Sequence, residues 1–106
     1  AGDDYTIILE STKVPVLSPA KKLAAEFLYT SGGQNNRNYL EGDVEFMIDD
    51  FAMEEVLFDP QTSGGLCLSV SPEEADKIIT DFRENNLEIY QIGQVKRKRS
   101  YKIIVK

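Results

Sequence analysis

The stretch most able to do chemistry is Asp59-Pro60-Gln61-Thr62-Ser63-Gly64-Gly65, which runs directly into an apolar segment. It places a carboxylate, an amide and two hydroxyls beside a Gly-Gly pair whose backbone amides can approach a ligand with no Cβ in the way. Successive exposed amides of this kind form concavities that bind anions. The same residues also make an ordinary tight turn, in which Ser and Thr bind nearby backbone groups. The residues alone leave both interpretations open.

A second candidate region contains Gly33, Arg37 and Asn38 in a polar segment. An arginine can bind phosphate through two parallel hydrogen bonds. It can equally tie its own loop to a neighbouring carboxylate, and Glu41 and Asp43 are the nearest acidic residues that follow it. Both a phosphate contact and a structural tie remain open for Arg37.

The chain offers little for catalysis on its own. It contains no histidine, the commonest general acid–base and metal ligand. Its single cysteine, Cys67, alternates with leucines and has no adjacent lysine or histidine to activate it, so we expect a packed thiol. The pairs Asp3-Asp4 and Asp49-Asp50 lack further ligands at a suitable spacing for a hard cation. We therefore expect no catalytic residue and no metal site in this chain.

Charge is distributed unevenly. The net charge is −6, but residues 1–95 carry 18 acidic and six basic side chains, whereas the last eleven residues carry six basic and no acidic ones. An acidic body argues against nucleic acid as a partner, because phosphate neutralisation needs a broad basic face. The basic run at residues 96–99 is most simply a solvated connection between two strands. No stretch approaches the roughly 20 apolar residues that span a bilayer, so no membrane partner is expected, and a single cysteine fits the reducing cytoplasm.

The elements that must position these residues follow from hydrophobic spacing. Alternating or β-rich patterns predict strands at residues 5–9, 44–48, 66–70, 87–95 and 101–105. A first helix is predicted to begin at Ser18-Pro19 and to end at the glycines that follow Ser31. The residues after those glycines, 34–38, are expected to form a polar loop, and residues 49–57 a short helix.

The most clearly signalled element is a helix at residues 72–84. Ser71 and Glu74 are spaced as a capping box with Pro72 at the first position, and Asn85-Asn86 supplies the C-cap. Its apolar residues fall at i, i+3, i+4 and i+7, which places Phe82 in the expected core. Residues 1–106 are thus expected to form a single α/β (α+β) domain. Its plan would be one mixed, mostly antiparallel sheet with two main helices packed on it, partly ferredoxin-like.

The motif at residues 59–65, followed by an apolar strand and Ser-Pro-Glu, closely resembles the C-terminal signature of the selenophosphate synthetase (selenide, water dikinase) family. Three further stretches agree in order with that family. They are Val14-Pro15-Val16-Leu17, Gly32-Gly33 with Arg37-Asn38, and Ile92-Gly93-Gln94-Val95. The sequence departs from the family where Ser18-Pro19-Ala20 stands for Pro-Gly-Ala. The resemblance covers nearly the whole chain.

The resemblance implies a specific activity. Members make selenophosphate from selenide and ATP, with AMP and orthophosphate as the other products and Mg2+ as the metal, for selenoprotein and selenium-modified tRNA synthesis. They share a two-domain architecture with aminoimidazole ribonucleotide synthetase and work as homodimers. The chain would be an incomplete C-terminal domain that lacks the N-terminal ATP-binding domain, and would be inactive alone. The residues expected to border the substrate site are Asp59, Gln61, Thr62, Ser63, Gly64, Gly65, Gly33, Arg37 and Asn38.

Two alternatives stay open. The first keeps the architecture and changes the enzyme, to an aminoimidazole ribonucleotide synthetase, a hydrogenase maturation factor or a thiamine monophosphate kinase; the motif at residues 59–65 argues against each of these. The second is a stand-alone ferredoxin-like regulatory module, which the order of strands and helices alone would permit.

Overall fold

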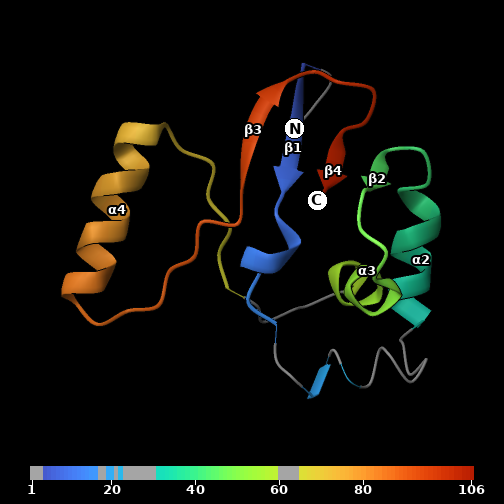
Figure 1. Cartoon of the computed structure of the whole chain (residues 1–106), viewed down its shortest axis with the longest axis horizontal. Coiled ribbons are helices and arrows are strands. Elements are labelled where there is room, and N and C mark those ends of the chain that lie inside the picture. Colours follow the sequence, from blue (N-terminus) through green and yellow to red (C-terminus); the bar gives the residue numbers. More distant parts are fainter. Residues whose placement is uncertain (1–3, 17–18, 21, 23–30, 60–64) are drawn as a thin grey trace.

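The computed structural model describes residues 4–16, 19–20, 22, 31–59 and 65–106. At its centre is a four-stranded sheet in the order β2-β4-β1-β3 (Figure 1). The strands are β1 (Tyr5–Leu9), β2 (Val44–Phe46), β3 (Gly93–Arg97) and β4 (Ile103–Val105). The α-helices in the described residues are α2 (Ser31–Tyr39), α3 (Phe51–Phe58) and α4 (Pro72–Glu84), and one short 3-10 helix, η1 (Ser11–Lys13), follows β1.

Strand β1 lies between β4 and β3. It pairs antiparallel with β3, from Tyr5 opposite Arg97 to Leu9 opposite Gly93, and parallel with β4. Strand β4 pairs parallel with β2. The expected α/β class and single mixed sheet are confirmed, but the expectation of mostly antiparallel pairing is wrong, because two of the three neighbouring pairs are parallel. Strands β1 and β2 do not pair with each other but lie on either side of β4 and run parallel to it, and a long connection that contains α2 joins them.

Two residues explain why β3 and the connection that follows it lie so close to β1. A Cβ at Gly93 would strike the carbonyl group of Ile8, so β3 can lie against β1 only with glycine at this position. Thr6 is completely buried, and its hydroxyl donates to the Tyr101 carbonyl at 2.7 Å and accepts from the Arg99 backbone N–H at 2.8 Å. The connection that leaves β3 is therefore anchored on β1 by its backbone. The basic side chains of residues 96–99 are exposed, as expected, but Lys96 and Arg97 belong to β3 and not to the connection.

The core of the described structure joins the middle of the sheet to α3. Its buried apolar residues are Ile8, Ala52, Met53, Phe58, Ile104 and Val105. The rings of Phe46 on β2 and Phe58 on α3 meet edge to face, with centroids 5.6 Å apart. Asp50 begins α3 by accepting the Met53 N–H on its Oδ1 at 3.1 Å, which confirms the short helix expected here.

In the first half of the chain, one predicted helix boundary is wrong. Ser31, Gly32 and Gly33 were expected to end a helix, but they begin α2, and the expected polar loop at residues 34–38 is helical. Of the helix expected from residue 19, Pro19, Ala20 and Lys22 are helical, whereas residues 21 and 23–30 lie outside the described residues. The turn after α2 contains Gly42 at φ 86°, a conformation that glycine adopts without strain.

Residues 65–92, called here the arm, form the second region of the molecule. Its helix α4 has the caps that the sequence predicts. Ser71 Oγ accepts from the Glu74 N–H at 3.3 Å, and Asn86 lies at φ 57° in the left-handed region. The N–H groups of Asn86 and Leu87 donate to the carbonyls of Arg83 and Phe82, which completes a Schellman motif.

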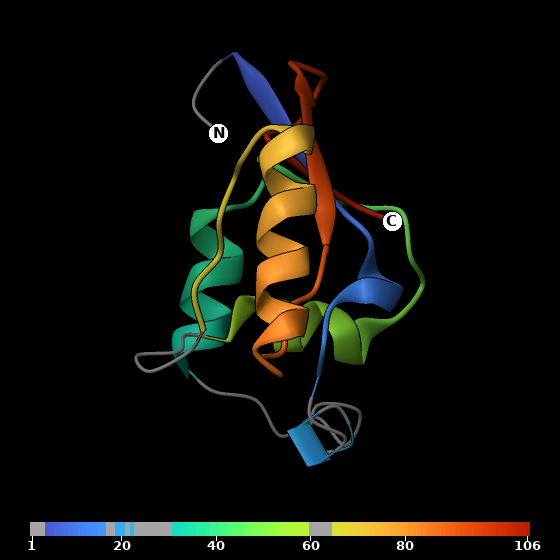
Figure 2. The same cartoon turned by 90° about the vertical axis from the view of Figure 1, so that its left-hand side faces the viewer.

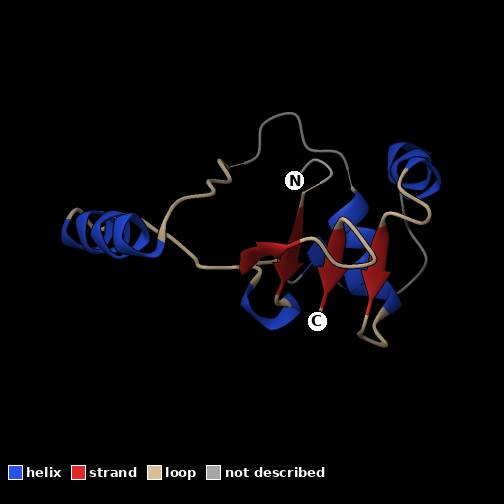
Figure 3. Cartoon of the chain, turned by 90° about the horizontal axis from the view of Figure 1, so that it is seen from above, coloured by secondary structure: helices blue, strands red, loops and turns tan. Residues whose placement is uncertain are grey.

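The arm does not pack as the sequence predicted. Residues 66–70 form no strand, only residues 93–97 of the later segment do, and no residue of α4 is buried. Phe82, expected in the core, is half-buried, and Cys67, expected to be a packed thiol, is exposed. Figures 1 and 3 show α4 standing apart from the sheet, on the side of β3. The second helix predicted to cover the sheet is thus present but not docked.

None of the helices in the described ranges combines the length and the apolar character needed to cross a membrane.

Candidate functional site

The residues expected to border a substrate site fall at three places in the fold. Gly33, Arg37 and Asn38 lie on α2, Asp59 directly follows α3, and Gly65 begins the arm. Gln61, Thr62, Ser63 and Gly64 lie outside the described residues. Gly33 is buried in α2, whereas Asn38, Asp59 and Gly65 are exposed. A Cβ at Gly65 would meet no atom within 4 Å, so packing within the described structure does not require glycine there.

Arg37 makes the densest set of contacts among these residues. Its Nη1 donates to Glu54 Oε1 at 3.0 Å and its Nη2 to Glu55 Oε1 at 2.5 Å. Its guanidinium carbon also lies 4.8 Å from the centre of the Phe58 ring and 5.2 Å from that of Phe51. Cation–π contact of this kind adds to the two ion pairs. The carboxylates that hold Arg37 are therefore on α3. Of the two interpretations left open by the sequence, the structure shows a structural tie, but to Glu54 and Glu55 instead of Glu41 or Asp43.

The electrostatics of this cluster favour the charged arginine. Burial opposes the charge of Arg37, but the hydrogen bonds and charges of Glu54 and Glu55 outweigh it, so the pKa of Arg37 is raised. The Glu55 side chain is only 2% exposed, and a carboxylate buried to this degree needs a partner. Because the pKa of Arg37 is higher in the folded state, the charged side chain stabilises the fold fully at neutral pH. This stabilisation is lost only when the pH rises through the pKa of the folded state, far above the physiological range.

Two further side chains of α2 reach the same part of α3. Gln34 Nε2 donates to Glu55 Oε2 at 2.9 Å, and Asn36 Nδ2 donates to the Phe58 carbonyl at 2.7 Å. We call Gln34, Asn36 and Arg37, with Glu54 and Glu55, the α2–α3 clamp. Phe58 is the last residue of α3, and Asp59 follows it directly. The clamp therefore fixes the end of the helix from which the motif at residues 59–65 departs.

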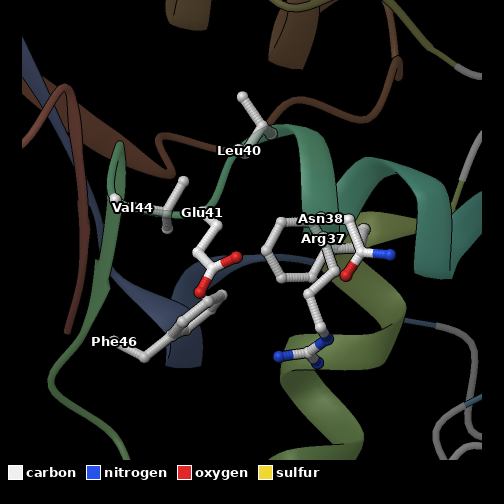
Figure 4. A pocket seen from close by; sticks show the side chains of 8 residues that line it. Arg37, Asn38, Leu40, Glu41, Val44 and Phe46 are labelled. Atoms are coloured by element: carbon white, nitrogen blue, oxygen red, sulfur yellow. The ribbon is translucent and has the colours of Figure 1, made fainter.

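A shallow hollow lies beside the clamp, between the end of α2 and β2 (Figure 4). It has a volume of about 330 Å³ and is lined by Arg37, Asn38, Leu40, Glu41, Gly42, Val44, Phe46 and Phe58. Figure 4 shows the Glu41 carboxylate beside the Phe46 ring, with the Arg37 guanidinium lower in the same space. The hollow brings together two residues predicted from the sequence, Arg37 and Asn38, but its only strong cation is already paired with two carboxylates.

Sequence reasoning missed the clamp because its two halves lie 17 to 22 positions apart along the chain. One signal was available. Gln34 and Arg37 are three residues apart, a spacing that places them on one helical face, and Glu54-Glu55 is an acidic pair inside an otherwise apolar helix. That signal was lost once residues 34–38 were read as a loop.

The described residues contain no group of three or more carboxylate or thiol side chains arranged to hold a metal ion. The Arg37 Nε has no hydrogen-bond partner within the described structure, although it is buried. The cluster is thus organised around one guanidinium and two carboxylates. These ion pairs hold α2 and α3 together.

Comparison with known proteins gives a consistent result. The whole chain, residues 1–106, matches the family model of the AIR synthase related protein, C-terminal domain. It is 39% identical over 105 residues to a selenide, water dikinase of Agathobacter rectalis, covering 98% of this chain and 31% of that protein. It is 37% identical over 105 residues to a selenide, water dikinase of Desulfitobacterium hafniense, covering 99% of this chain and 31% of that protein. The chain thus spans about a third of the length of these relatives.

Proposed function

The chain belongs to the family of AIR synthase related proteins, as a C-terminal domain, and on this basis we propose that it is the C-terminal domain of a selenide, water dikinase. The complete enzyme would make selenophosphate from selenide and ATP, with AMP and phosphate as the other products. The observation that carries the proposal is the match over 98–99% of this chain to relatives that bear this name. The motif at residues 59–65 supports it, because the resemblance to this family rests on that string.

The role of this domain follows from what its residues offer. The chain has no histidine, and Cys67 is exposed with no lysine or histidine next to it in the sequence, so we propose that the catalytic groups of the complete enzyme lie outside this domain. ATP and Mg2+ would be held by the rest of the polypeptide, because the described residues contain no cluster of side chains that fits a metal ion. The proposed contribution is the border of the substrate site, with the hydroxyls of Thr62 and Ser63 and the amides of Gly64 and Gly65 directed to phosphate.

The α2–α3 clamp would hold the proposed border of the substrate site in place. Arg37 is held by two carboxylates and two rings, so we assign it to holding α3 in place and not to binding phosphate directly. Asn36 binds the final carbonyl of α3, one residue before the motif begins. A loop that leaves a helix end held in this way starts from a defined position, which is what a preorganised hydrogen-bonding loop requires. We further propose that the complete enzyme is a cytoplasmic homodimer.

A chimeric enzyme tests the proposed function. The third of the Agathobacter rectalis protein that matches this chain is replaced by residues 1–106, and selenophosphate is measured by phosphorus NMR. We expect turnover within about tenfold of the parent, a loss of about 1.4 kcal/mol in transition-state stabilisation or less. The matched third of the Desulfitobacterium hafniense protein in the same host is the positive control. An inactive chimera beside an active control, both folded, would contradict the proposal.

The same chimera tests the loop. Thr62→Ala with Ser63→Ala should lower turnover by about 10²–10³-fold, the usual cost of removing a donor from a preorganised site. Turnover within about threefold of the unmodified chimera would assign the loop to structure alone. The 106-residue chain by itself should show no saturable heat with Mg-ATP in a calorimetric titration, and a micromolar dissociation constant would instead indicate an independent nucleotide-binding module.

A further inference from the structure

Strand β3 is an edge of the sheet with a free row of backbone groups. It is last in the strand order and, among the described strands, pairs with β1 alone. Figure 2 views the molecule from the side of this edge, with α4 in the foreground. The hydrogen bond from the Lys98 N–H to the Asp4 carbonyl fixes the register of the β1–β3 ladder. In this register the N–H and C=O groups of Gly93, Val95 and Arg97 point away from β1, and such an edge is a template for one more strand.

The side chains on and directly after this edge are basic. Residues 96–99 are all lysine or arginine and all exposed, and the ion pairs of the described residues include none of them. Asp4 lies opposite Lys98 across the ladder, whereas Glu10, at the other end of β1, is paired with Lys13. The edge therefore keeps an excess of positive charge.

This charge determines which strand the edge accepts. Lysine on an edge strand repels a strand of the same charge, and natural sheets use it to prevent two edges from pairing. A second β3 edge would bring two basic runs to one interface, an arrangement that like-charge repulsion disfavours. An acidic strand is attracted by the same side chains. The edge thus discriminates between strands by their charge.

The order of residues along β3 defines the sequence that fits it. Side chains alternate between the two faces of a strand, so Val95 and Arg97 lie on one face and Lys96 on the other. Val95 is 44% exposed and offers an apolar contact to the residue opposite it. Lys96 and Arg97 each favour a carboxylate opposite. Because these three positions are consecutive, the matching segment has two adjacent acidic residues next to an apolar one.

We propose that β3 is the docking strand for an extended, acidic segment of another protein, which adds to the sheet as its fifth strand. The outward backbone groups of Gly93, Val95 and Arg97 hold the segment, and the side chains of residues 95–97 select its sequence. The basic run then has a role in recognition beyond that of a solvated connection. The proposal uses no residue of the α2–α3 clamp or of the motif at residues 59–65, and it does not depend on the proposed activity.

An NMR titration of the unmodified chain at low ionic strength tests the proposal with the blocked peptide Thr-Glu-Glu-Val-Thr-Val-Thr. We expect saturable shifts in β3 with a dissociation constant of about 100 µM, and protection of the Val95 and Arg97 amides from hydrogen exchange only when the peptide is present. The control peptide has proline in place of the first valine, which keeps the charge but removes an N–H that the new ladder needs. It should bind at least about tenfold more weakly, about 1.4 kcal/mol. No saturation by about 2 mM, or equal binding of the two peptides, would overturn the proposal.

A pair of variants separates recognition at β3 from attraction by the overall charge. Lys96→Glu and Lys77→Glu change the net charge equally, and both lysines are exposed, but only Lys96 is on β3. Lys96→Glu should weaken binding of the acidic peptide at least about fivefold and Lys77→Glu less than about twofold. Equal effects would contradict the proposal. Protection of the Val95 and Arg97 amides without peptide would also overturn it, by showing that residues 66–70 of the same chain or, where protection rises with concentration, a second copy already covers the edge.

Discussion

The molecule has two halves, the sheet with α2 and α3, and the arm with α4. The sequence signals for α3 and α4 are equally strong, but only α3 packs into the core. Helix α3 has an Asp50 cap and four buried residues, and it is tied to α2 by ion pairs, hydrogen bonds and ring contacts. Helix α4 has a Ser71 cap, a proline at its start and a complete Schellman motif, yet none of its residues is buried. The contrast teaches that capping decides where a helix begins and ends, whereas tertiary contacts decide whether it contributes to a core.

The largest expected effect compares one phenylalanine from each half. Phe58 is 7% exposed and contacts both Phe46 and Arg37, so Phe58→Ala should lower the free energy of unfolding by about 3–5 kcal/mol. Phe82 is half-buried on an undocked helix, and Phe82→Ala should cost less than about 1 kcal/mol. Urea denaturation at low micromolar concentration measures both. Equal losses would remove the distinction between the two halves.

The next effect tests the clamp. Arg37→Met leaves the Glu55 carboxylate buried without its cation, and removing one partner of a buried pair costs about 3–5 kcal/mol. Because the Arg37 side chain is 27% exposed, we expect about 2–3 kcal/mol. Lys13→Met is the control, since its pair with Glu10 is exposed on both sides and is worth less than about 1 kcal/mol. In a double-mutant cycle, adding Glu55→Gln should restore part of the loss, and strict additivity would argue against the pair.

A smaller effect concerns the end of α3. Asn36→Ala removes the hydrogen bond to the Phe58 carbonyl and should cost about 1 kcal/mol. Asn35 is the neighbouring residue on the same helix and is exposed. Asn35→Ala should be neutral or slightly stabilising, because alanine has the higher helix propensity. If thermal denaturation gives the two variants the same stability, the Asn36 contact does not hold the helix end.

The smallest global effect belongs to the arm. Ser71→Ala removes the cap of α4, which is worth about 1 kcal/mol to the helix itself. Because α4 is not docked in the described structure, we expect lower helix content at residues 72–84 by NMR chemical shifts, with global stability changed by less than about 0.5 kcal/mol. A full loss of about 1 kcal/mol in global unfolding would show that α4 is part of the core.

The structural features that depend on a few neighbouring residues were predicted from the sequence. The caps of α4, the short helix at α3, strands β1, β2 and β4 and the exposed basic run can all be argued from a few adjacent positions. The pairing order of the sheet could not be predicted in this way, because parallel and antiparallel neighbours are chosen by long connections. The docking of Phe82 failed for a related reason: periodicity defines an apolar face but does not show what covers it.

The sequence predicted some residues of the candidate site but not their partners. Arg37 and Asn38 were identified, and the structure brings both to one hollow, but the partners of Arg37 came from a helix 17 and 18 residues away. The glycines at residues 32 and 33 have two common uses, a helix end and a close helix contact, and sequence spacing selected the first. The assignment of residues 59–65 to a substrate site remains a prediction that only the activity of the complete enzyme tests.

Amide hydrogen exchange of the unmodified chain, followed by NMR, tests the contrast between the halves most directly. We expect β1, α2 and α3 to be protected to the level of global unfolding, and α4, a helix of 13 residues with no buried residue, to be nearly unprotected. Equal, strong protection of α4 and α3 would contradict the account.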